Sequence, residues 1–213
     1  MIKKEIREKM LDIFSHYGQE FDAFLIQDDD NFFIVDWKDK NGSGNLATRY
    51  ILDKKEGTFI ITGDSGDCIA CWYNELTPEN LSVYVSDVRY FMGKIQCSTD
   101  KYTYECDDIE ADLDEIKEEL RKYYNEHPDY YDWDVDDLDE DFEDIKNYLY
   151  DFGWAGGQFP EDAYDLMSKF YSEVWESPFS DLGQRISNRI YLWAVGYQSA
   201  IEKLRGKKYW REY

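Results

Sequence analysis

The sequence predicts an α+β protein, with a small antiparallel sheet in its N-terminal half and a mostly helical C-terminal half. Two observations favour this class. Short runs rich in Phe, Ile and Val alternate with turn residues before residue 63, and apolar residues recur at helical spacing after residue 107. A chain of 213 residues is also long enough to bury a substantial core.

The N-terminal half should contain one helix and then the sheet. Residues 2–17 are expected to form a helix, because apolar side chains recur there three or four positions apart. Gly57 ends the turn that joins the last two strands, where glycine tolerates a positive φ. The expected strands cover residues 21–27, 31–37, 46–52 and 58–62.

A helix and an extended segment should connect the two halves. Thr77 and Pro78 are typical of a helix start, and the apolar residues after them predict one helix that reaches Phe91. Residues 96–104 are expected to be extended.

Four apolar stripes predict four helices in the C-terminal half. The last helix should be the most buried, because residues 190–199 contain no charged side chain. We expect an α+β portion over residues 1–106 and a helical portion over residues 107–213, packed as one compact unit. The stripes run from Ile109 to Tyr124, from Val135 to Leu149, from Tyr164 to Val174 and from Ile186 to Leu204.

The negative charge is concentrated in one segment. The chain has 24 Lys and Arg against 47 Asp and Glu, a net charge of −23. Residues 101–150 contain 20 acidic and 5 basic side chains, a net charge of −15. Such a field excludes a general basic surface for nucleic acid or for an anionic membrane. An aromatic content of 18% excludes an acidic disordered tail.

Residues 107–144, here called the acidic belt, contain 19 carboxylates and three basic side chains. The apolar stripes direct most of these carboxylates away from the core. Tyr130 and Trp133 alternate with the acids, and flat rings can stand in for bases against arginine side chains. The belt residues expected to contact a partner are Asp114, Glu115, Glu118, Asp129, Tyr130, Asp132, Trp133, Asp134, Asp136, Asp137, Glu140, Glu143 and Asp144.

The spacing of the belt carboxylates resembles that of phosphates. Nine of them occur over residues 107–126, which gives one per about 3 Å of helix axis. One strand of a DNA duplex carries a phosphate about every 3.4 Å. Repulsion within the helix is relieved by one expected pair, Glu118 with Lys122. The alternatives are a solvated helix face, aromatic rings that only fill the core, and another kind of acidic docking surface.

Metal and cofactor sites have little support. Asp132, Asp134, Asp136 and Glu143 match positions 1, 3, 5 and 12 of a calcium-binding loop, but Asp137 stands where the sharp turn requires glycine.

A zinc or redox site has no better support. Cys68 and Cys71 form a C-x-x-C pair with no second close pair and no nearby histidine, so we expect reduced thiols that pack as small apolar residues. The sequence therefore predicts neither a metal nor a cofactor.

The sequence also lacks the familiar catalytic and targeting patterns. It contains no nucleophile elbow, no zinc-protease helix motif, no P-loop and no dinucleotide-binding glycine motif, which predicts a protein that is not an enzyme. Residues 1–8 mix charges and lead into no apolar run of signal-peptide length, so we expect a cytoplasmic location.

In composition and organisation the chain resembles the acidic inhibitors of phages and mobile elements, the anti-restriction and anti-CRISPR proteins that mimic DNA. The resemblance rests on the acidic belt with its alternating segment Asp129-Tyr130-Tyr131-Asp132-Trp133-Asp134. Residues 47–74 also look like uncharacterised phage proteins of Gram-positive bacteria. The resemblance implies a protein without catalytic residues that occupies the nucleic-acid channel of its target.

The expected function is therefore that of a non-enzymatic inhibitor. Its carboxylate surface would enter the basic cleft of a nucleic-acid-binding host defence protein, such as a CRISPR effector, a restriction enzyme or another nuclease. The alternative is an interaction module that uses aromatic residues near Trp37 and Trp72, with the belt serving only solubility. Neither function involves direct binding of nucleic acid or of a membrane, and the sequence leaves the oligomeric state open.

Overall fold

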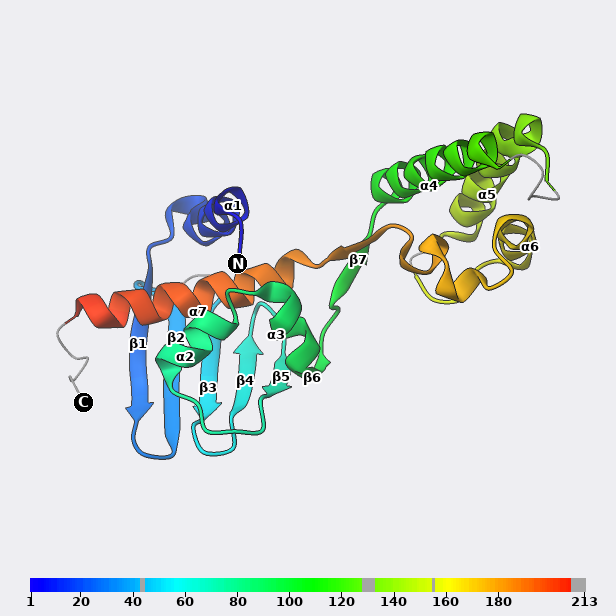
Figure 1. Ribbon diagram of the computed structural model, residues 1–213. Helices are drawn as coiled ribbons and strands as arrows, with labels where there is room; N and C mark the ends of the chain where they lie inside the picture. Colours follow the sequence, from blue (N-terminus) through cyan, green and yellow to red (C-terminus); the bar gives the residue numbers. More distant parts are fainter. Residues whose placement is uncertain (43–44, 128–132, 155, 208–213) are drawn as a thin grey trace. The chain divides into compact units, whose positions relative to one another are not determined.

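The structure is a computed structural model that describes residues 1–42, 45–127, 133–154 and 156–207, and it confirms the α+β class (Figure 1). The chain divides into two compact units. The first unit comprises residues 1–101 and 187–213, and the second unit comprises residues 102–186. The second unit is therefore an insertion in the first. The expected helical portion ran on to residue 213, whereas residues 187–213 return to the first unit.

A six-stranded antiparallel sheet forms the base of the first unit, with every strand next to its sequence neighbours. Four of its strands confirm the expected runs, but β5 was not expected. Its four residues are all apolar or cysteine and show no alternation that would mark a strand. The strands are β1 (Phe21–Asp28), β2 (Phe32–Asp39), β3 (Thr48–Asp53), β4 (Thr58–Gly63), β5 (Cys68–Cys71) and β6 (Ile95–Ser98).

Helix α7 (Asn188–Gly206) packs on one face of this sheet (Figure 1). The Tyr50 hydroxyl on β3 donates a hydrogen bond of 3.1 Å to the Trp193 carbonyl. Gly196 permits this approach, because a Cβ atom there would lie 2.4 Å from the Tyr50 hydroxyl oxygen. Ten residues of α7 are buried, which agrees with its uncharged middle.

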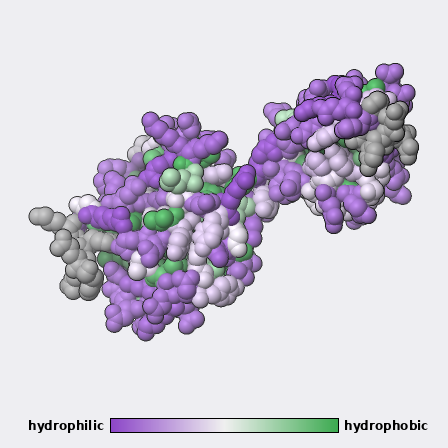
Figure 2. Space-filling view, viewed as in Figure 1, coloured by the Kyte–Doolittle hydropathy of each residue, from purple (hydrophilic) through white to green (hydrophobic). Residues whose placement is uncertain are grey.

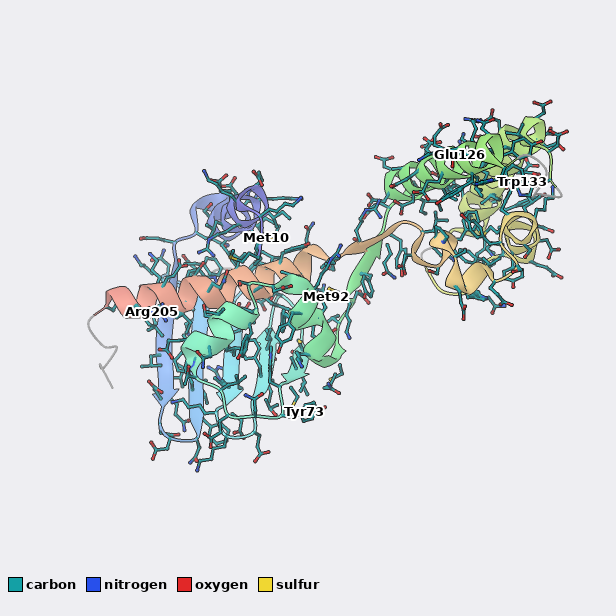
Figure 3. All side chains as sticks on the ribbon, viewed as in Figure 1. Met10, Tyr73, Met92, Glu126, Trp133 and Arg205 are labelled. Carbon is teal, nitrogen blue, oxygen red and sulfur yellow. The ribbon has the colours of Figure 1, made fainter. Side chains whose placement is uncertain are left out.

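The described part of the first unit also contains three further helices and a short 3₁₀ segment. Helix α1 (Lys4–Ser15) packs on α7 and buries Met10 (Figure 3), and η1 (His16–Gly18) follows it. The expected single helix up to Phe91 is wrong, because it divides into α2 (Pro78–Tyr84) and α3 (Val88–Lys94). Asp87 causes the division, since its carboxylate accepts the Tyr90 N–H at 3.1 Å and so begins a new helix.

The second unit is helical and has its own core. The two long belt stripes are buried as expected, and α5 ends at Gly153 in the left-handed conformation, with φ of 64°. The expected extended segment over residues 96–104 is divided between β6 of the first unit and β7 of the second. The elements of the second unit are β7 (Tyr102–Tyr104), α4 (Cys106–Glu126), η3 (Val135–Asp137), α5 (Leu138–Phe152), α6 (Glu161–Phe170), η4 (Val174–Glu176), η5 (Pro178–Asp181) and β8 (Gln184–Ile186).

The chain enters and leaves the second unit through paired strands. β7 and β8 form a two-stranded antiparallel sheet. Next to it, the Ser187 N–H donates a hydrogen bond of 2.9 Å to the Lys101 carbonyl. The two ends of the first unit at the insertion point are therefore adjacent. Across the described ranges, no helix is long and apolar enough to cross a membrane.

Candidate partner-binding surface

Nearly all of the net negative charge belongs to the inserted second unit. Residues 102–186 contain 27 acidic and 6 basic side chains, a net charge of −21. The other 128 residues contain 20 acidic and 18 basic side chains, a net charge of −2. Hydrophilic residues dominate the face of α4 that is drawn in Figure 2. The unit boundary thus separates a strongly acidic unit from one that is almost neutral.

Cations of the second unit pair with acids along the contact between α4 and α5. Lys117 lies 3.5 Å from Asp114 and 3.4 Å from Asp139 of α5. Arg121 pairs with Glu118 and with Asp139, the latter at 2.9 Å. The hydrogen bond from Arg121, helped by Lys117, holds the pKa of Asp139 below its ordinary value. These contacts fix the two helices against each other.

Lys146 of α5 extends the same row of ion pairs. It lies 2.6 Å from Glu143 and 3.5 Å from Glu110 of α4. The hydrogen bond with Glu143 raises the pKa of Lys146. Lys117, Arg121 and Lys146 therefore each form an ion pair between the two belt helices.

A second set of ion pairs anchors α4 to β8. Arg185 pairs with Asp112 at 2.7 Å and with Asp108 at 3.1 Å. The Gly183 N–H donates to the same Asp112 carboxylate at 2.7 Å. Partial burial opposes the charge of Asp112, but the hydrogen bonds from Arg185 and Gly183 outweigh it and lower the pKa. On the far side of α5, Lys169 pairs with Asp141 at 2.7 Å.

Among the described residues, three of those expected to bind a partner are thus in ion pairs within the protein. Asp114 and Glu118 contact cations one turn away on α4, and Glu143 does so on α5. The expected pair of Glu118 with Lys122 is replaced by Glu118 with Arg121. An i,i+3 pair is as accessible on a helix as an i,i+4 pair, so the sequence spacing could have indicated it.

Four other expected residues form what we call the α5 carboxylate face: Asp136, Asp137, Glu140 and Asp144. All four are exposed, and none has an ion pair with any residue that the structure describes. Glu140 and Asp144 are one helical turn apart on the outer side of α5. Glu115 on α4 is likewise exposed and unpaired within the described ranges.

The other residues that were expected to bind a partner do not belong to the α5 carboxylate face. Asp134 is exposed, and its carboxylate accepts the Asp136 N–H at 3.0 Å at the start of η3. Trp133 is half-buried and packs on the core, with ring centroids 5.2 Å from Tyr124 and 5.3 Å from Phe170 (Figure 3). Asp129, Tyr130 and Asp132 lie outside the described residues.

The structure also places the residues that were considered for metal binding. Cys68 and Cys71 are three positions apart on β5, so their side chains point to opposite faces of the sheet and cannot share one ion. Burial raises the pKa of Cys68 to about 12, which makes it an unreactive thiol. Among the residues that the structure describes, no group of three His, Cys, Asp or Glu side chains is placed to hold a metal ion.

The chain was compared with family models, with curated proteins and with solved structures, and none of them matches.

Proposed function

We propose that the second unit binds the basic cleft of a nucleic-acid-binding protein, such as a defence nuclease or effector complex, and so inhibits it without catalysis. The observation that supports this proposal is the charge separation: the 85-residue insertion holds −21 of the net charge of −23. A surface needed only for solubility has no reason to be confined to one unit, because solubility depends on the net charge of the whole molecule.

The ion pairs inside the second unit determine which carboxylates remain for a partner. Lys117, Arg121 and Lys146 hold α4 and α5 together, which keeps the outward carboxylates at fixed spacing. The α5 carboxylate face and Glu115 then remain for a partner. Binding of such a surface to a basic cleft is favourable because both partners release counterions. The same effect drives the binding of proteins to DNA.

Competition with DNA tests this function. The immobilised protein is incubated with a bacterial lysate, and bound proteins are eluted with duplex DNA. We expect nucleic-acid-binding proteins in the eluate, because DNA and the second unit compete for one cleft. For a purified partner, the dissociation constant should rise at least ~10-fold between ~50 and ~200 mM salt. Partners that DNA fails to displace would contradict the proposal.

A charge-neutralised variant tests which carboxylates bind. Combining Asp136→Asn, Glu140→Gln and Asp144→Asn removes three charges from the α5 carboxylate face and no ion pair within the described residues. We expect the partner's dissociation constant to rise about 10- to 100-fold, as measured by titration calorimetry. Unchanged affinity would exclude the α5 carboxylate face as the binding surface.

The matched control removes the same charge elsewhere in the second unit. Asp165→Asn on α6 is combined with Glu173→Gln and Glu176→Gln near η4, and all three side chains are exposed and unpaired within the described ranges. We expect less than about a 3-fold change in affinity, because only the long-range field is altered. Equal losses in both triple variants would show that binding depends on diffuse charge and not on a defined surface.

One observation favours the second candidate, an interaction module that uses aromatic residues of the first unit. That surface was expected near Trp37 and Trp72, and both of these side chains are buried. Tyr73, however, is 75% exposed and has a φ of 57°, a conformation that bulky residues rarely adopt (Figure 3). Under this alternative, Tyr73→Ser would weaken partner binding and the triple variant of the α5 carboxylate face would not.

A further inference from the structure

The sheet face opposite α7 bears a continuous row of isoleucines. Ile34 of β2 pairs with Ile51 of β3, Ile51 pairs with Ile60 of β4, and Ile60 pairs with Ile69 of β5. Tyr50 faces α7, so its neighbour Ile51 and the rest of the row face away from that helix. Ile69 is 39% exposed, and the other three are half-buried.

The helices that the structure describes in the first unit pack on the other face of the sheet. In Figure 1, α7 and α2 cross the sheet on the same side, and α3 contacts the sheet through Phe91, which packs against Phe59. In the described part of the first unit, no helix packs over the isoleucine row.

At the isoleucine row the strands are apolar on both faces. The residue after each isoleucine of the row faces α7 and is buried: Val35, Leu52, Ile61 and Ala70. Antiparallel strands with one face in water usually alternate apolar with polar residues, and uninterrupted apolar runs are typical of strands covered on both faces. The strand sequences therefore indicate that the isoleucine row is covered in the assembled protein.

Two of the charges that flank the row, on Arg49 and Asp53, are complementary under a two-fold rotation. Arg49 and Asp53 lie two residues before and after Ile51 on the same face of β3. Consider two sheets that face each other and are related by a two-fold axis parallel to the isoleucine row. The strands of the second copy then run in the opposite direction to those of the first. Arg49 of each copy therefore faces Asp53 of the other. Asp53 has no ion pair with any described residue of its own chain, and Arg49, which pairs with Asp36 at 2.6 Å, is 48% exposed.

We propose that two copies of this chain form a dimer by packing their sheets face to face over the isoleucine row. Ile34, Ile51, Ile60 and Ile69 form the apolar centre, and two Arg49–Asp53 pairs fix the orientation. Twisted sheets that pack in this way cross at about 30°, so the central strands β3 and β4 make the closest contact. The first unit has a net charge of only −2, so it opposes such packing little.

Sedimentation of the full-length protein tests the dimer. The expected mass is twice the chain mass of 25.5 kDa at ~100 µM protein and falls toward that of one chain on dilution. Ile51→Asp should raise the dimer dissociation constant at least ~100-fold, because it places two carboxylates together on the axis. Val83→Asp, at a 67% exposed position of α2, makes the same chemical change away from the row and should leave the mass unchanged.

A charge swap tests the orientation. Arg49→Glu should dissociate the dimer because it faces Asp53 of the other copy, and adding Asp53→Arg should restore it. Circular dichroism shows whether each variant is folded. A protein that stays monomeric at ~100 µM, or a dimer that survives both Ile51→Asp and Arg49→Glu, overturns the proposal.

Discussion

The Tyr50 hydroxyl and the Trp193 carbonyl are joined by a hydrogen bond of 3.1 Å across 143 positions of sequence. Tyr50 precedes the second unit in the chain and Trp193 follows it. The core of the first unit is therefore complete only when α7 has packed on the sheet. The Tyr50 hydroxyl is buried, and donating to this carbonyl keeps it from being an unsatisfied polar group.

This close approach predicts the effect of Gly196→Ala. Alanine favours helix formation, but its Cβ would lie 2.4 Å from the Tyr50 hydroxyl oxygen and would displace α7 from the sheet. We expect the free energy of unfolding to fall by about 1–3 kcal/mol in urea titrations. Gly206→Ala on the same helix is the control, because no described residue lies within 4 Å of the added atom. A more stable Gly196→Ala variant would contradict the packing described for α7.

The insertion should be separable from the first unit. The Ser187 N–H and the Lys101 carbonyl are 2.9 Å apart, so a short glycine-serine linker can replace residues 102–186 without moving the sheet or α7. We expect the shortened chain to unfold cooperatively and to keep well-dispersed amide signals in NMR spectra, because its buried residues come from outside the insertion.

The same deletion separates the two proposals. Removing the second unit should abolish partner binding, since it removes the α5 carboxylate face. Dimer formation should persist, since the isoleucine row belongs to the first unit. A shortened chain that lacks cooperative unfolding would mean that the two units depend on each other for folding.

Asp112 should make the second unit sensitive to acid. Its folded-state pKa is lowered, because the hydrogen bonds from Arg185 and Gly183 outweigh the effect of partial burial. Because the pKa is lowered, the ionised carboxylate stabilises the folded protein at pH values above its ordinary pKa of 3.8. This stabilisation is lost as the pH falls through the pKa of the folded state. Asp112→Asn should therefore cost about 1–2 kcal/mol at neutral pH.

The pH dependence distinguishes this effect from a general loss of packing. The difference in unfolding free energy between the native protein and Asp112→Asn should shrink as the pH falls below 3.8, since the native side chain is then protonated too. Asp144→Asn, which removes an exposed carboxylate without an ion pair to any described residue, should show no such loss at neutral pH. A difference for Asp112→Asn that stays constant with pH would show that its charge is not responsible.

Local patterns predicted much of the secondary structure because they depend on nearest neighbours in the chain. The stripe from Ile109 to Tyr124 became α4, and the uncharged stretch over residues 190–199 became the most buried part of α7. The same reasoning failed at Asp87, where one side-chain cap divided a helix, and at β5, whose four residues show no alternation.

The sequence by itself determined the fold class, the acidity of the belt and the outward direction of its carboxylates, because composition and helical period are properties of the chain. Only the tertiary structure decided that α7 belongs with the sheet. It also decided that Asp114, Glu118 and Glu143 pair with cations, while Glu140 and Asp144 pair with none of the described ones. The reason is physical: ion pairs between helices and the packing of α7 depend on distances between residues far apart in sequence, and local patterns contain no information about those distances.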